Sequence, residues 1–243
     1  MPTVYLVTGG SRGIGFGLVQ ALASAPDTIV FAGARNPSSK DLSTLATAHP
    51  DKVIPIALES ADIQLNKAAA KSIEEKAGKL DVVIAVAGIG NAISMSEIEI
   101  PEFLETFKVN TVGPLVLFQS VRHLLKKTFG KFVAVSSSHG SIAEMLPGPA
   151  GAYCVTKAAL NSLTVKLREE NPDLVIFPID PGFVATEGAL KFATDLGTPP
   201  EILKLAAPID KAAADILKHV HEAVKVEKPR GFWNAMGPRE IAF

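Results

Sequence analysis

Several features are scarce in this sequence, and each scarcity argues against a class of protein. A single cysteine, Cys154, excludes an intramolecular disulfide and fits a reducing compartment, so we expect a cytoplasmic protein. The first residues, MPTVYLVTGG, lack a basic stretch leading into an apolar run, so no signal peptide is expected. No window approaches about 18 uncharged apolar residues, so no membrane span is expected either.

An excess of charge of one sign is also missing. The chain has 24 basic and 25 acidic residues, a net charge of −1, and its lysines and arginines are spread out. Without a basic patch, neither nucleic acid nor an anionic membrane surface is an expected partner. No metal site is expected, and we find no internal repeat and no low-complexity linker.

Apolar residues, by contrast, are plentiful. Hydrophobic residues make up 47% and charged residues 20% of the 243 positions, enough for a sizeable core. We therefore expect one α/β domain over 1–243, with a cofactor half at about 1–130 and a catalytic and substrate half at about 131–243.

Short apolar, β-branched runs recur along the chain, which is typical of strands covered on both faces. They span residues 3–8, 28–33, 52–58, 81–88, 131–137, 173–179 and 231–236. Helical patterns lie between them, including 13–25, 63–78 and 102–127. This alternation predicts a doubly wound, seven-stranded parallel sheet with helices on both faces. Irregular segments are expected at 36–41, 138–151 and 182–208, and the last two are long enough to suggest a function.

The first predicted strand runs into a glycine-rich turn, TGGSRGIG (8–15), and then into a helix. Glycine allows a tight turn and a close approach of a pyrophosphate, while the helix N-terminus offers unpaired N–H groups. The spacing is not G-x-G-x-x-G, and a glycine turn without a ligand is the competing interpretation. Its position after the first strand favours a dinucleotide site.

The second predicted strand ends without an acidic residue, since no Asp or Glu occurs between 28 and 40. An NAD site usually has such a residue on the ribose 2′-hydroxyl, whereas arginine suits a 2′-phosphate. Arg35 lies just past this strand and Arg12 lies in the glycine turn. Two guanidiniums could clamp one phosphate, which favours NADP(H), although either could also be an ordinary surface group.

The stretch AYCVTK (152–157) places Tyr153 and Lys157 four residues apart on a predicted helix, so their side chains share a face. A nearby ammonium is expected to lower the phenol pKa and to make the pair an acid–base catalyst. A core tyrosine beside a snorkelling lysine is the alternative for an isolated pair. Serines 136–138 follow a predicted strand, at the edge where open α/β sheets bind ligands.

Together these motifs resemble the short-chain dehydrogenases/reductases over nearly the whole chain. TGGSRGIG, VNTVGP (109–114), VSSSHG (135–140), YCVTK (153–157) and DPGFVAT (180–186) occur in the family's order. Within the family, the sequence is most similar to sniffer-like carbonyl reductases and to fungal ketoreductases acting on aromatic polyketides such as norsolorinic acid.

The resemblance implies a single-domain Rossmann fold and a division of roles. Ser137 holds the carbonyl, with Ser136 as second choice; Tyr153 donates the proton, Lys157 binds the nicotinamide ribose and Asn110 positions a lysine-bound water. The cofactor contacts implied, with the two arginines included, are Gly9, Ser11, Arg12, Gly13, Ile14, Gly15, Arg35, Glu59, Ala87, Gly88, Tyr153, Lys157, Pro181, Gly182, Val184 and Thr186.

The sequence also departs from the family pattern. AVAG (85–88) replaces the family's NNAG, which removes both asparagine side chains. The segment between Ser137 and Tyr153 is longer than in many members, and the insertion at 144–151 is expected at the pocket mouth.

The expected reaction is NADPH-dependent reduction of a hydrophobic or aromatic ketone or aldehyde. The predicted pocket residues are Ser138, His139, Met145, Leu146 and Phe183. For His139, a satisfied turn histidine is the competing interpretation. The alternatives are a dinucleotide-sensing or scaffold protein on the same fold and a serine hydrolase. Apolar surplus on 101–127 and 151–169, with the family resemblance, suggests a homodimer or homotetramer.

Overall fold

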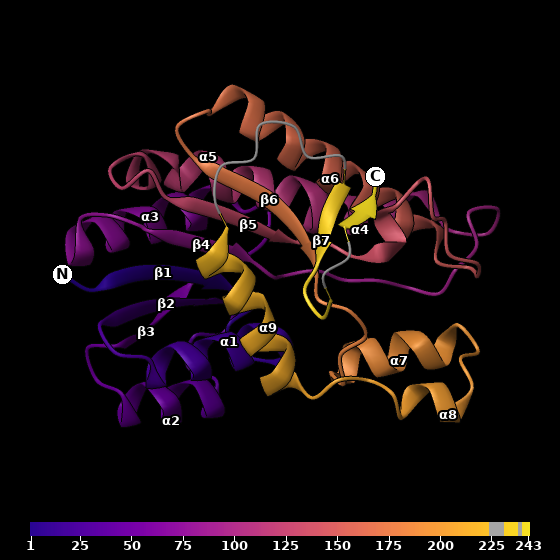
Figure 1. The fold of residues 1–243 in the computed structure, drawn as a ribbon, viewed down its shortest axis with the longest axis horizontal. Coiled ribbons are helices and arrows are strands. Elements are labelled where there is room, and N and C mark those ends of the chain that lie inside the picture. Colours follow the sequence, from indigo (N-terminus) through magenta and orange to yellow (C-terminus); the bar gives the residue numbers. More distant parts are fainter. Residues whose placement is uncertain (224–230, 238–239) are drawn as a thin grey trace.

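The computed structural model describes residues 1–223, 231–237 and 240–243, and in these ranges eight strands form one sheet (Figure 1). The strand order is β3-β2-β1-β4-β5-β6-β7-β8. The strands are β1 Thr3–Thr8, β2 Thr28–Ala34, β3 Val53–Ala57, β4 Val82–Ala85, β5 Lys131–Val135, β6 Val175–Asp180, β7 Gly231–Asn234 and β8 Glu240–Ala242. The α/β doubly wound class predicted from the sequence is confirmed.

The predicted strand number of seven needs one correction. β1 to β7 are parallel, and β8 adds an eighth, antiparallel strand beside β7 at the edge of the sheet. A strand of three residues is too short to show an apolar pattern. Because only a few residues separate it from β7, an antiparallel return is the available geometry.

Helices cover both faces of the sheet: α1, α2 and α9 lie on one face and α3, α5 and α6 on the other (Figure 1). The α-helices are α1 Gly13–Ser24, α2 Lys40–Ala48, α3 Ile63–Ala77, α4 Ile100–Phe107, α5 Gly113–Lys126, α6 Gly151–Glu170, α7 Glu187–Asp195, α8 Pro200–Leu203 and α9 Ile209–Glu222. None of the helices in the described part of the chain is both long and apolar enough to cross a membrane.

Strand periodicity divides the core between the two faces. In β1, Val4 and Leu6 join the cluster beneath α3, α5 and α6, while Tyr5 and Val7 join the cluster beneath α1 and α9. Successive side chains of a strand point to opposite faces, so a strand covered on both sides is apolar at every position. This explains why the runs in the sequence are continuous rather than alternating.

Two predicted segments differ in detail from the structure. The helix expected over 102–127 is broken by one turn of π-helix, Lys108–Val112, between α4 and α5. The segment 182–208, expected to be irregular, contains α7 and α8, which project beyond the end of the sheet (Figure 1). Thr186 begins α7 by accepting a hydrogen bond from Ala189 N, a cap that composition alone did not reveal.

Candidate active site

The glycine turn lies at the carboxyl edge of the sheet, where the strand order reverses between β1 and β4. Gly10 N donates to Gly33 O of β2 at 3.0 Å, which fixes the turn against the neighbouring strand. A Cβ on Gly15 would overlap the Gly9 carbonyl, and Gly13 adopts a φ of +53°. The chain can therefore turn this tightly into α1 only with glycine here.

Several expected cofactor residues surround this turn with polar groups available for a ligand. Arg12 precedes α1 and gives it no side-chain cap. Arg12 and Arg35 are both exposed, and among the described residues neither takes part in an ion pair. Glu59 is exposed just after β3, and its backbone carbonyl accepts from Asn66 Nδ2 at 2.8 Å. The helix N-terminus and the two exposed guanidiniums are groups of the kind that bind phosphate.

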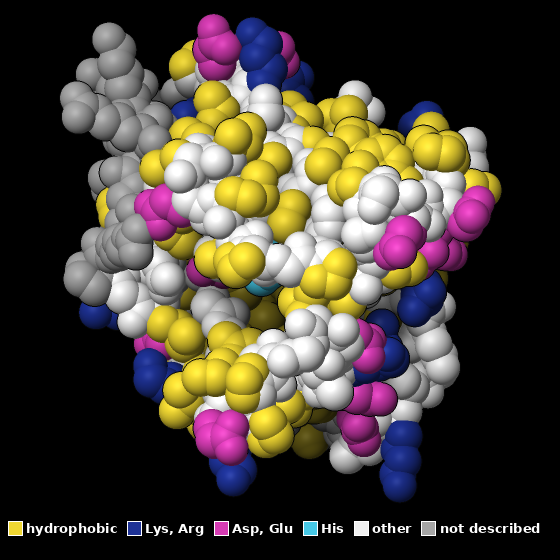
Figure 2. Space-filling model, turned by 90° about the vertical axis from the view of Figure 1, so that its right-hand side faces the viewer, with side chains coloured by type: hydrophobic (Ala, Val, Ile, Leu, Met, Phe, Trp, Pro, Cys, Tyr) yellow, Lys and Arg dark blue, Asp and Glu magenta, His cyan; other side chains and the backbone are white. Residues whose placement is uncertain are grey.

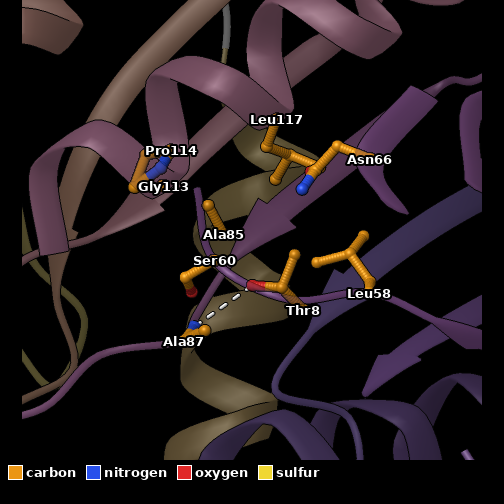
Figure 3. A pocket seen from close by; sticks show the side chains of 9 residues that line it. All are labelled: Thr8, Leu58, Ser60, Asn66, Ala85, Ala87, Gly113, Pro114 and Leu117. Atoms are coloured by element: carbon orange, nitrogen blue, oxygen red, sulfur yellow. Dashed lines mark hydrogen bonds between the residues drawn. The ribbon is translucent and has the colours of Figure 1, made fainter. Parts of the chain in front are cut away.

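The segment that lacks the two asparagines is held by Thr8 at the end of β1. Thr8 Oγ1 accepts from Val86 N at 2.9 Å. It also accepts from Ala87 N at 3.1 Å, the bond drawn in Figure 3. A cavity of about 10 Å³ lies beside this contact. Its lining residues are Thr8, Leu58, Ser60, Asn66, Ala85, Ala87, Gly113, Pro114 and Leu117. Small side chains at 85 and 87 thus leave a space the size of about one water molecule, while the backbone remains tethered.

Asn110 supplies a second tether, from the π-helical turn. Its Oδ1 accepts from Ile89 N at 2.8 Å, and its Nδ2 donates to Ile89 O at 2.7 Å and to Thr156 Oγ1 at 3.0 Å. The side chain is therefore fully used in joining the loop after β4 to α6. A Cβ on Gly88 would lie 3.2 Å from Asn110 Oδ1 and 3.6 Å from Lys157 Nζ, so this turn of π-helix borders the proposed catalytic lysine.

Ser137 and Tyr153 meet at this edge. Ser137 follows β5, and its hydroxyl accepts from His139 N at 3.2 Å. The same hydroxyl lies near enough to the Tyr153 phenol to lower its pKa. Ser136, the second choice from the sequence, is buried, and its hydroxyl is committed to Asn161 Oδ1 at 2.6 Å. Of the two serines, the geometry favours Ser137.

Lys157 lies beneath Tyr153 as the helix spacing predicts. Its side chain is buried, and Nζ donates to Val135 O at 2.8 Å and stands 5.5 Å from the centre of the Tyr153 ring. A Cβ on Gly140 would overlap the backbone of Lys157, so the turn after Ser137 packs directly on α6. Serine, tyrosine and lysine are thus brought together from β5 and α6.

The electrostatics of the pair differ from the expectation. Burial raises the pKa of Tyr153 to about 12; the Ser137 hydrogen bond lowers it, and the charges of Asp180 and Cys154 raise it further. Burial also lowers the pKa of Lys157 to about 8, against the opposing charge of Asp180. In the protein alone, the predicted acidification of the phenol by Lys157 is therefore wrong, because desolvation disfavours the charged forms of both groups.

Three rings gather over the site. His139 lies 5.8 Å from Tyr153 and 5.9 Å from Phe192 between ring centres, and Tyr153 lies 5.2 Å from Phe192. Burial lowers the pKa of His139, so its imidazole is neutral at pH 7. Phe192, which reaches the site from α7, is not among the residues predicted from the sequence; only its position in the 182–208 segment could have indicated it.

The remaining predicted pocket residues occupy different places. Ser138 and Phe183 are half-buried, and Phe183 O accepts from Ala207 N at 2.8 Å. Met145 and Leu146 are exposed on the loop before α6. Hydrophobic side chains surround a hollow on the side of the molecule where α7 and α8 project (Figure 2).

The segment after β6 lies against the glycine turn. Pro181 is buried and Gly182 has a φ of +74°, while Val184 is buried and bridged to Ala207. A Cβ on Gly13 would lie 3.2 Å from Thr186 Cγ2. The first and last predicted cofactor motifs therefore meet in space. The Cys154 thiol, whose pKa is raised by burial, acts as a packing group.

Comparison with protein families and known sequences agrees with this geometry. A family model described as short chain dehydrogenase matches residues 3–196. The short chain dehydrogenase gsfK of Penicillium aethiopicum is 37% identical over 225 residues, covering 88% of this chain and 90% of the relative. The norsolorinic acid ketoreductase nor1 of Dothistroma septosporum is 35% identical over 242 residues, covering 95% of this chain and 88% of the relative.

Solved structures give the same result. The NADPH-bound carbonyl reductase from chicken fatty liver superposes with a TM-score of 0.82 at 29% identity, over 91% of this chain and 88% of that chain. The carbonyl reductase Sniffer of D. melanogaster shares the fold over 100% of both chains, with a TM-score of 0.85 at 24% identity. The resemblance inferred from the motifs is confirmed: the chain belongs to the short-chain dehydrogenase family.

Proposed function

We propose that the protein reduces a ketone or aldehyde to an alcohol with NADPH, using Tyr153 as proton donor. The observation that carries the proposal is the meeting of Ser137, Tyr153 and Lys157 at the edge of the sheet where the glycine turn lies. The similarity to proteins named as ketoreductases and carbonyl reductases supports this assignment.

The residues present fit a phosphorylated dinucleotide. A glycine turn without room for a Cβ at Gly15 would let a pyrophosphate approach the start of α1. Arg12 and Arg35, which are exposed and form no ion pair with any described residue, would hold a 2′-phosphate. Ala87, Gly88, Val184 and Thr186 would border the remainder. When bound, the cofactor supplies the hydride.

The chain's own groups handle the carbonyl and the proton. The Ser137 hydroxyl holds the substrate oxygen, and Tyr153, which stays protonated because its pKa is about 12, donates to that oxygen as negative charge develops. Lys157 holds its charge beneath the phenol, and Asn110 keeps the loop at Ile89 in place beside it.

The surroundings favour an apolar carbonyl compound. His139 and Phe192 pack their rings beside Tyr153, and the exposed Met145 and Leu146 stand at the mouth. Apolar and aromatic walls with few polar groups select hydrophobic or aromatic ligands. We assign this pocket to the second half of the chain and cofactor binding to the first.

Tyr153→Phe tests the proposal. NADPH oxidation with a panel of ketones, aldehydes and quinones should fall by about 10³-fold, on the scale of a lost general acid, while NADPH still binds. Tyr5→Phe is the matched control, because it removes the other tyrosine, whose hydroxyl bonds His221 Nε2 at 3.0 Å beneath the opposite edge of the sheet.

Two outcomes would overturn the proposal. Undiminished turnover in Tyr153→Phe would remove the tyrosine from the reaction. NADPH binding without oxidation by any carbonyl in the wild type would favour a dinucleotide-sensing protein instead, and ester hydrolysis without cofactor would favour a serine hydrolase.

A further inference from the structure

A buried carboxylate lies at the site and has no role in the mechanism above. Asp180 is the last residue of β6 and is 4% exposed. Its Oδ1 accepts from Gly182 N at 3.2 Å. Burial raises the pKa of the carboxyl, and the backbone N–H groups of Gly182 and Ser138 oppose that rise. A charge removed from water in this way is costly unless hydrogen bonds and an opposite charge offset it.

The two N–H donors belong to different functional loops. Ser138 directly follows Ser137, and Gly182 lies in the turn that leads to Val184 and Thr186. The carboxylate therefore joins the serine loop after β5 to the predicted cofactor turn after β6. The backbone of Asp180 is itself fixed in the sheet, because its carbonyl accepts from Ala235 N at 2.8 Å.

The opposite charge comes from Lys157, whose Nζ donates to Val135 O at 2.8 Å. Val135 is the register partner of Ile179, the residue before Asp180, so the ammonium lies at the same edge as the carboxylate and lowers its pKa. The carboxylate acts in turn on both Lys157 and Tyr153. The titratable groups on which it acts are Tyr153 and Lys157 on α6, and its register partner on β7 is the neutral Asn234. Next to Tyr153 lie Cys154 in sequence and the His139 ring at 5.8 Å. With the imidazole and the thiol neutral, lysine and aspartate balance each other.

We propose that Asp180 is a positioning residue of the active site: its buried carboxylate ties the Ser137 loop to the Gly182 turn and provides the counter-charge for Lys157. The inference rests on the proposed function for its catalytic consequence only. The carboxylate keeps Lys157 charged and Tyr153 protonated, so the phenol is held ready to donate a proton. The equilibrium between ketone and alcohol is unaffected.

Asp180→Asn tests the counter-charge while leaving the bond to Gly182 N in place. The amide keeps one oxygen for Gly182 N, loses the second acceptor and removes the charge. Removing the negative charge should lower the pKa of both Lys157 and Tyr153 by about one unit, as expected for the loss of a nearby buried charge. The alkaline limb of carbonyl reduction should move by the same amount. Asp180→Ser, which keeps a small acceptor without charge, is the second variant if the amide prevents folding.

The phenol can be titrated without any substrate. The chain has two tyrosines, so in a Tyr5→Phe background the ultraviolet absorbance of phenolate reports Tyr153 alone. An alkaline pH jump, read before unfolding begins, should show ionisation at lower pH in Asp180→Asn. The control is Asp81→Asn, a carboxylate at the opposite edge that accepts from Val4 N at 2.8 Å.

The readouts distinguish the two ideas. An unshifted phenol titration in both Asp180 variants, or an equal shift in Asp81→Asn, overturns the role of Asp180 whatever the enzyme does. A shifted titration in a protein that reduces no carbonyl leaves Asp180 as the counter-charge and overturns the proposed function instead.

Discussion

At the scale of single residues, burial governs the active-site chemistry. It moves the pKa of Tyr153 up to about 12 and that of Lys157 down to about 8, so each group is held toward its neutral form. A cofactor carrying positive charge on its oxidised ring would act against the first shift. In the protein alone, the Tyr153 phenol is consequently protonated at neutral pH and can act as an acid rather than as a base.

The pH dependence follows from Lys157. We expect the rate of carbonyl reduction to decline as the pH rises through about 8, where Lys157 loses its charge, while Tyr153 remains protonated up to about 12. Stopped-flow NADPH oxidation over this range measures the limb. A constant rate up to pH values well above 8 would show that Lys157 remains charged or that its charge is not needed.

The same shift predicts a stability difference. The folded-state pKa of Lys157 lies below its ordinary value of 10.5, so between about 8 and 10.5 the folded state binds fewer protons than the unfolded state. The contribution of this group to folding therefore rises with pH across that window. Urea midpoints on either side of it should show this rise in the wild type and lose it in Lys157→Met, with the exposed Lys204→Met as control.

At the scale of elements, turns rather than helices set the geometry of the site. Thr8 holds the segment after β4 through two backbone N–H groups, and the π-helical turn aims Asn110 at the peptide of Ile89. These contacts hold the loop in place although both asparagines of the family motif are absent. The departure noted in the sequence thus leaves the loop attached.

Gly15 provides a test at this scale. Gly15→Ala would place a methyl group against the Gly9 carbonyl, which belongs to the backbone and cannot rotate away. NADPH affinity should fall at least about tenfold, because the turn must open. Gly188→Ala in α7 is the matched control: among the described residues, no atom outside its chain neighbours and the backbone of its own helix lies within 4 Å of the added methyl. The free energy of unfolding of this variant should rise by about 0.4–1 kcal/mol. Fluorescence titration with NADPH would decide, and equal affinity in the two variants would contradict the prediction.

At the scale of the whole molecule, one outer surface remains apolar. Ile100 and Leu104 of α4, Val112 of the π-helical turn and Val155 of α6 are exposed, and α4 and α6 contact each other. An apolar surface shared by adjoining helices is suited to a self-complementary contact. We therefore expect a homodimer, or a tetramer built from such dimers.

Sedimentation can test this contact. The double variant Leu104→Glu/Val155→Glu should shift the protein to monomer, because burying two carboxylates without partners opposes association. Ile63→Glu is the control, because it makes the same change from an apolar residue to a carboxylate at an exposed position of α3. It should leave the sedimentation coefficient unchanged. A wild-type monomer at micromolar concentration would contradict the expectation.

The sequence alone determined the α/β class and the order of the motifs, and it predicted the side chains that we propose to be reactive. Strands buried on both faces read as continuous apolar runs, and glycines at 9, 13 and 15 are needed wherever the chain turns this tightly. These properties are local, so a one-dimensional pattern can record them. The sequence did not predict β8 or the helices of 182–208, because short elements are specified by their neighbours rather than by their own periodicity.

Only the tertiary structure decided how the reactive groups behave. Spacing placed Lys157 beside Tyr153, but the depth of burial reversed the expected effect on the phenol pKa. The tertiary structure also favours Ser137 over Ser136, because the Ser136 hydroxyl is bonded to Asn161. It places Phe192 beside Tyr153 and Asp180 beside the Gly182 turn. Desolvation and charge depend on everything that surrounds a group in three dimensions, and residues distant in sequence supply most of that environment.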